Sequence, residues 1–136
     1  MWRSTFGCLL LGATAMLPPR PAPAQEPGVP KKLLEARLEA VRQVFKAAKH
    51  EQEAGRGIFE DLPLWSRRLL EAERALATTK EQQLTACREH LKRMQDFESV
   101  EKARYEAGRV SIKDYAAATY HRTEAEILLA RVEGMK

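Results

Sequence analysis

The chain has 136 residues, enough for one domain, and between residues 31 and 133 its only glycines and prolines are Gly55, Gly57, Pro63 and Gly108. So few helix breakers predict a few long helices, and they exclude a β-sandwich, a barrel or a Rossmann-type domain, which need many turns. The formal charge of +4 is spread over interleaved acids and bases, which argues against nucleic acid as a partner.

The first 24 residues have the pattern of a secretory signal peptide rather than that of an uncleaved anchor. Arg3 gives a short basic start, residues 5–17 are apolar but too few to span a membrane, and Ala22-Pro23-Ala24 fits the usual cleavage site. We therefore expect an exported protein, in the periplasm or associated with an outer membrane. No later segment is apolar enough to predict a membrane span in the exported chain.

Residues 25–30 are expected to form a short extended lead, and residues 31–136 the helical domain. The first helix is predicted from Lys31 to about residue 54, because apolar residues recur there at spacings of four and three. They are Leu34, Leu38, Val41, Phe45 and Ala48. Gly55 is expected in the turn that follows, because glycine commonly ends a helix.

The second helix is predicted to start near Asp61, a good N-cap residue, with Pro63 in the first turn. No breaker follows before Gly108, so we expect one helix of 44 positions, about 66 Å long, over residues 63–106. Its apolar face is interrupted for six residues from Thr78 on. An alternative therefore remains, in which the chain bends near Thr78 and forms a compact four-helix bundle.

The third helix is predicted from Ser111 to about Glu133, because Ser111 and Asp114 fit a capping box. The three helices together predict an all-α fold of antiparallel hairpins or coiled coil, in which a long central helix is flanked by two shorter ones. Two helices bury only one seam, so we expect self-association or a helical partner to complete the core.

The two turns are copies of each other. Residues 53–56 (EAGR) recur 53 positions later as residues 106–109. Ten of 25 positions are identical between residues 53–77 and 106–130, whereas chance gives about two in a chain of this composition. The sequence therefore predicts an internal duplication, with copies at about 38–77 and 91–130.

Residues 105–115 (YEAGRVSIKDY) resemble the periplasmic tip of the TolC family of outer-membrane efflux proteins, whose members also have an internal duplication and a long helix flanked by shorter ones. The residues that we assign to the tip or to partner docking are Tyr105, Gly108, Arg109, Ser111, Asp114 and Tyr115 in the second copy, and Gly55, Asp61 and Leu62 in the first. Ile58 stands where the second copy has its serine.

The resemblance implies a tip that meets an adaptor protein in the cell envelope, and hence an efflux-associated role through helix–helix docking. The chain shows no stretch of about ten alternating residues of the kind that such channels need, so the resemblance covers the hairpins alone. The alternative is a periplasmic structural or scaffold protein that shares the hairpin design and has no part in transport.

No pattern of catalytic, metal-binding or cofactor-binding residues is recognisable, so a non-catalytic protein without cofactor is expected. His50, His90 and His121 are far apart in the sequence among charged residues, and we expect them to be solvated. Loss of the signal peptide would remove Cys8 and leave Cys87, which is either buried or pairs between chains. We favour burial, because Cys87 is in apolar register with its neighbours.

Overall fold

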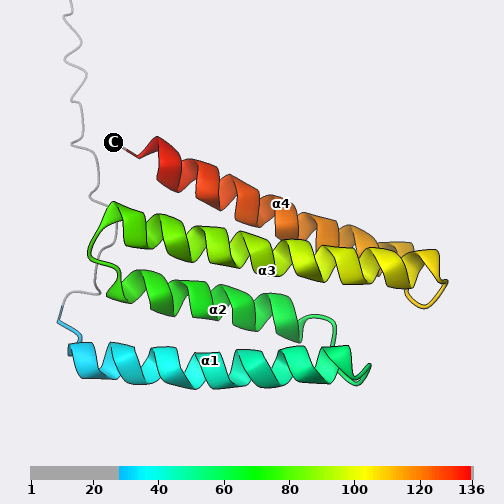
Figure 1. Ribbon diagram of the computed structural model, residues 1–136, viewed down its shortest axis with the longest axis horizontal. Helices are drawn as coiled ribbons and strands as arrows, with labels where there is room; N and C mark the ends of the chain where they lie inside the picture. Colours follow the sequence, from blue (N-terminus) through cyan, green and yellow to red (C-terminus); the bar gives the residue numbers. More distant parts are fainter. Residues whose placement is uncertain (1–27, 136) are drawn as a thin grey trace, which may run out of the picture.

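The computed structural model describes residues 28–135, so the predicted signal peptide and the first half of the predicted lead lie outside the described residues. This part of the chain contains no strand and four helices: α1 (Lys31–Glu53), α2 (Asp61–Leu76), α3 (Lys80–Glu106) and α4 (Ile112–Gly134) (Figure 1). The predicted all-α fold is confirmed. None of the helices in the described range is long and apolar enough to cross a membrane.

The helices lie side by side in chain order, with α1 and α4 on the outer sides (Figure 1). Contacts are most extensive within the pairs α1–α2 and α3–α4, and α2 packs less extensively against α3. The core consists of three groups of apolar side chains, one between α1 and α2 and two where α2, α3 and α4 meet. The largest fully buried apolar residues are Phe97, Met94 and Cys87, all in α3. The interior of the domain is therefore built around α3.

The prediction of one unbroken helix over residues 63–106 is wrong. The helix ends at Leu76, Ala77 is extended, and α3 begins at Lys80 and folds back along α2. Thr79 caps α3: its hydroxyl accepts a hydrogen bond from the Gln82 amide at 3.2 Å, and the Gln82 side chain accepts one from the Thr79 amide at 3.3 Å. The interruption of the apolar face therefore marks the start of a new helix, where a threonine and a glutamine form a capping box.

The two Glu-Ala-Gly-Arg segments adopt the same conformation. Gly55 and Gly108 have φ values of 71° and 68°, in the left-handed region where a Cβ is unfavourable. The amide of Arg56 donates to the carbonyl of Glu51 at 2.9 Å, and the amide of Arg109 donates to that of Arg104 at 2.8 Å. Both helices thus end in the same glycine-based C-terminal motif.

The starts of α2 and α4 differ. Ser111 and Asp114 form the predicted capping box at the start of α4. Asp61, predicted as the N-cap of α2, is instead its first helical residue, and the residue before it makes no side-chain capping hydrogen bond. Because Ile58 replaces the serine, α2 begins two residues later in the repeat than α4 does.

Candidate docking surface

The turn between α3 and α4 extends beyond the end of the α1–α2 hairpin (Figure 1). The overhang arises because α3 has 27 residues and α2 only 16. At this turn the rings of Tyr105 and Tyr115 stack, with centroids 5.6 Å apart and planes 17° apart. Tyr105 is 40% exposed and Ile112 is 60% exposed, so the overhanging end presents apolar surface to solvent.

The six residues assigned to the tip in the second copy are brought together at this turn, but they have different roles. The Ser111 hydroxyl donates to Asp114 Oδ2 at 2.7 Å, and the Ser111 amide donates to the same oxygen at 3.1 Å. These hydrogen bonds lower the pKa of Asp114. The serine and the aspartate therefore build the turn, and Tyr105, Tyr115 and Arg109 remain as the side chains available for contacts.

The three residues assigned in the first copy lie at the other turn and do not join this group. Gly55 is in the turn itself, and Asp61 is partly exposed at the start of α2. Leu62 is only 8% exposed and belongs to the core cluster of α2, α3 and α4. The tip-like pattern of the first copy therefore contributes a core residue and not a second aromatic tip.

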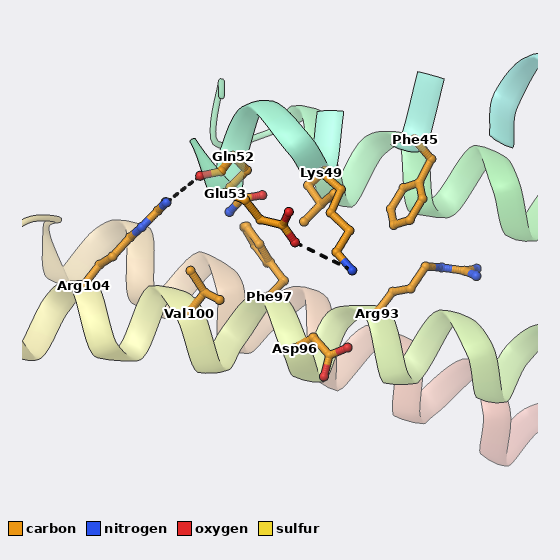
Figure 2. Close-up of a pocket in the computed structure, with 10 residues that line it drawn as sticks. Phe45, Lys49, Gln52, Glu53, Arg93, Asp96, Phe97, Val100 and Arg104 are labelled. Atoms are coloured by element: carbon orange, nitrogen blue, oxygen red, sulfur yellow. Dashed lines mark hydrogen bonds and ion pairs between the residues drawn. The ribbon is translucent and has the colours of Figure 1, made fainter. Parts of the chain in front are cut away.

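A groove between α1 and α3, which we call the α1–α3 groove, begins where the overhanging end leaves the body of the domain. Its volume is about 480 Å³, within the usual range for ligand sites. Figure 2 shows side chains of both helices directed into it. Its lining consists of Phe45, Lys49, Gln52, Glu53, Leu62, Arg93, Asp96, Phe97, Val100 and Arg104.

The apolar part of the α1–α3 groove is made by Phe45, Leu62, Phe97 and Val100, and its edges carry charges of both signs. Val100 is 44% exposed, so its side chain is open to a partner. On α3 the lining residues recur at spacings of three and four over twelve positions, from residue 93 to residue 104, a length of about 16 Å along the helix. An apolar groove of this length with charged edges is the surface on which an amphipathic helix docks.

One end of the groove is held by a buried polar cluster. Glu101 is completely buried and accepts hydrogen bonds from Gln52 Nε2 at 3.0 Å and from Arg104 Nη1 at 2.8 Å. Arg104 also donates to the backbone carbonyl of Gln52 at 2.8 Å, as Figure 2 shows. Because buried charges need partners in fixed geometry, this cluster sets the position of the end of α1 against α3.

A second buried polar cluster joins α2 to α3. His90 is 7% exposed, and its Nδ1 lies 2.9 Å from the hydroxyl of Ser66, which accepts a hydrogen bond from Arg93 Nε at 2.9 Å. Burial, and then the positive charges of Arg93, Arg67 and His121, lower the pKa of His90 to about 4. The neutral imidazole is therefore the form that this interface accommodates.

The prediction that the histidines are solvated is thus wrong for His90 and holds fully only for His50. His90 is buried because residues 87, 90 and 94 lie on one face of α3, and the His121 side chain is 26% exposed beside Glu60. Cys87 is buried, as favoured. Burial raises the pKa of its thiol, the opposite of what an activated nucleophile requires.

Within residues 28–135 no group of three or more histidine, cysteine, aspartate or glutamate side chains could hold a metal ion. Comparison of the chain with family models, with curated proteins and with solved structures finds no match. The two features from which a function can be argued are therefore the overhanging α3–α4 turn and the α1–α3 groove. The turn follows from the sequence pattern, whereas the groove was not predicted.

Proposed function

We propose that this protein is a non-catalytic helical protein of the cell envelope that docks onto a helix of another protein. The observation that carries the proposal is the α1–α3 groove, an apolar channel about three helical turns long that continues toward the overhanging turn. The partner helix packs on Phe45, Phe97 and Val100, and the charged edges of the groove select its orientation.

The aromatic pair at the overhanging turn supports this proposal. Tyrosine is enriched at protein interfaces because its ring packs well and its hydroxyl stays hydrated. Tyr105 and Tyr115 are already stacked, so little side-chain freedom is lost when a partner covers them. The resemblance of this turn to TolC-family tips adds an efflux-associated role to the proposal, with an adaptor-like helical protein as the partner.

A structural or scaffold role is the second candidate, and the break at Thr79 favours it. In the efflux family the long helix between the two turns is a main feature, whereas here α2 folds back on α3. The domain is shorter and thicker than an extended hairpin as a result. A helix docked in the α1–α3 groove would serve a scaffold equally well, so the two candidates share a surface and differ in the partner.

The groove is tested by replacing Val100 with glutamate in the full chain and measuring the capture of an envelope partner by photo-crosslinking from position 105. Ile127→Glu is the matched control, because Ile127 is 39% exposed on α4 and does not line the groove. We expect crosslinking to be lost in Val100→Glu and kept in Ile127→Glu. A chain that stays monomeric by light scattering and yields no crosslinked partner from the envelope would contradict the proposal.

The two candidates are separated by deleting the gene and complementing it with each variant. An efflux-associated role predicts greater sensitivity to toxic apolar compounds, which wild type and Ile127→Glu restore and Val100→Glu does not. A scaffold role predicts unchanged compound export together with altered envelope assembly. Both measurements use the same three chains, so a difference cannot come from expression alone if the protein levels are matched.

A further inference from the structure

A smaller pocket lies between α2 and α4, with α3 at its base, and we call it the α2–α4 pocket. Its volume is about 170 Å³, below the roughly 300 Å³ at which sites for drug-sized ligands begin. It is lined by Pro63, Arg67, Leu70, His90, Met94, Tyr120, His121, Glu124, Leu128 and Arg131. A site of this size admits a small ion or a short organic molecule.

Cationic side chains reach this pocket from two helices. Arg67 comes from α2, and the one ion pair that it makes with the described residues, with Glu71 at 3.6 Å, is exposed and therefore weak. Arg131 comes from α4 and forms no ion pair within residues 28–135. His121, also on α4, lines the pocket in a half-buried position, 3.5 Å from Glu60. Two arginines are thus free to turn toward a ligand.

The charges that act on His90 at the base of the pocket are positive. Each of the three charges that shift the pKa of His90, those of Arg93, Arg67 and His121, is positive and lowers it. Glu124 is the one carboxylate that lines the pocket within the described residues, and Glu73 lies beyond Arg93, at 3.6 Å from it. A negative charge placed above His90 would therefore be stabilised by its surroundings.

We infer that the α2–α4 pocket binds a small oxyanion, a carboxylate or a phosphate, between Arg67 and Arg131. Guanidinium groups suit both anions because their planar N–H groups match two oxygens at once. Leu70, Met94 and Leu128 supply an apolar wall that takes a short carbon chain attached to the anion. The site is independent of the α1–α3 groove, with which it shares no lining residue.

The test is a titration of the full chain with sodium phosphate, and separately with sodium propionate, at constant ionic strength. The ring signals of the three histidines are followed by NMR. We expect saturable shifts of the His90 and His121 signals, a rise in the pKa of His90, and no change at His50, which is exposed on α1. The anion with the lower Kd identifies which of the two chemistries the pocket takes.

Arg67→Gln and Arg131→Gln should each raise Kd about tenfold or more, because each removes a charge-assisted hydrogen bond. Arg56→Gln is the matched control, since Arg56 is exposed in the α1–α2 turn and does not line the pocket. Both pocket arginines are exposed, so their replacement leaves the core intact.

Glu124→Gln should change Kd in the opposite direction to the two arginine variants. It removes the carboxylate that lines the pocket, so it should lower Kd several-fold without any new contact. A response that does not saturate, that chloride reproduces, or that Arg131→Gln leaves unchanged would overturn the inference. Saturable binding that Arg67→Gln weakens and Glu124→Gln strengthens would establish it.

Discussion

The α1–α2 and α3–α4 hairpins share a sequence repeat and end their first helices in the same way, yet their equivalent residues are buried to different extents. Phe97 in α3 is 2% exposed, whereas its repeat equivalent Val44 in α1 is 38% exposed. Glu101 is fully buried, and its equivalent in α1 is the small residue Ala48, which is 9% exposed. The difference follows from position, because α3 lies between two helices and α1 has one neighbour for most of its length (Figure 1).

The comparison shows that one turn motif can serve two roles in one chain. In the first copy the turn closes a hairpin on the outer side of the domain. In the second copy it lies at the end of an overhang, with stacked aromatic rings beside it. The positive-φ glycine is the same in both turns. The surrounding residues determine whether the turn carries exposed apolar surface.

The largest expected effect is at the equivalent pair Phe97 and Val44. Phe97→Ala should lower the free energy of unfolding by about 3–5 kcal/mol, because it empties a site in the core beside Phe59. Val44→Ala should cost less than about 1 kcal/mol, since Val44 is already exposed. Urea unfolding measures both. Equal losses of unfolding free energy would mean that Val44 is buried to the same extent as Phe97.

The next effect is a dependence of stability on pH at His90, whose repeat equivalent is Arg37. Because the pKa of folded His90 is lowered to about 4, the unfolded chain binds more protons between pH 6.5 and pH 4. Stability due to His90 is full above pH 6.5 and falls by about 3 kcal/mol as the pH drops to 4. The raised pKa of Glu73 acts in the opposite direction.

Unfolding of wild type and of His90→Gln at a series of pH values isolates this contribution, because both chains keep Glu73. We expect the wild-type free energy of unfolding to fall more steeply than that of the variant from pH 6.5 downward. Parallel curves would show that His90 does not change its protonation on unfolding in this range.

Gly55→Val and Gly108→Val should each lower the free energy of unfolding by about 2 kcal/mol, and the two losses should be equal. Both glycines have φ near +70°, and no atom lies within 4 Å of an added Cβ at either, so we expect the loss to come mainly from backbone strain. Thermal unfolding of the two variants compares the turns directly. A much smaller loss at Gly108 would mean that the overhanging turn can relax without disturbing the domain.

The smallest effects concern the helix starts. Ser111→Ala should cost about 1 kcal/mol, because it removes the cap of α4. Ile58→Ser should stabilise the first hairpin by a fraction of that, since it supplies the missing serine three residues before Asp61 at a site that is 68% exposed. Amide hydrogen exchange in the first turns of α2 and α4 reports each change. Slower exchange in the first turn of α2 in Ile58→Ser would support the conclusion that the two hairpins differ at this position because the first lacks the serine cap.

The C-terminus of α1 and the N-terminus of α4 are predictable from the sequence, because the residues that determine them are local. Gly55 and the Ser111–Asp114 box act within a few residues of the helix ends that they define. The break between α2 and α3 also has a local sequence pattern, Thr79 and Gln82 at capping-box spacing, although no glycine or proline marks it. Capping side chains can therefore end a helix as decisively as glycine does.

The surface features were less predictable because they depend on residues far apart in the sequence. His90 shares the buried face of α3 with Cys87 and Met94, but no spacing within α3 shows that its imidazole meets Ser66, 24 residues earlier. The α1–α3 groove depends on Gln52 and Glu101, 49 residues apart, which hold α1 at one place along α3. Periodicity gives the buried face of each helix but not the register between helices.

The serial order of the four helices has a consequence for how the domain forms. Because the most extensive contacts join α1 to α2 and α3 to α4, each of them closes a short loop of the chain. Domains with such local contacts fold in microseconds to milliseconds. During synthesis, α1 meets α2 and α3 meets α4 as soon as the second helix of each pair has emerged, and the core residues that α2 shares with α4 are covered last.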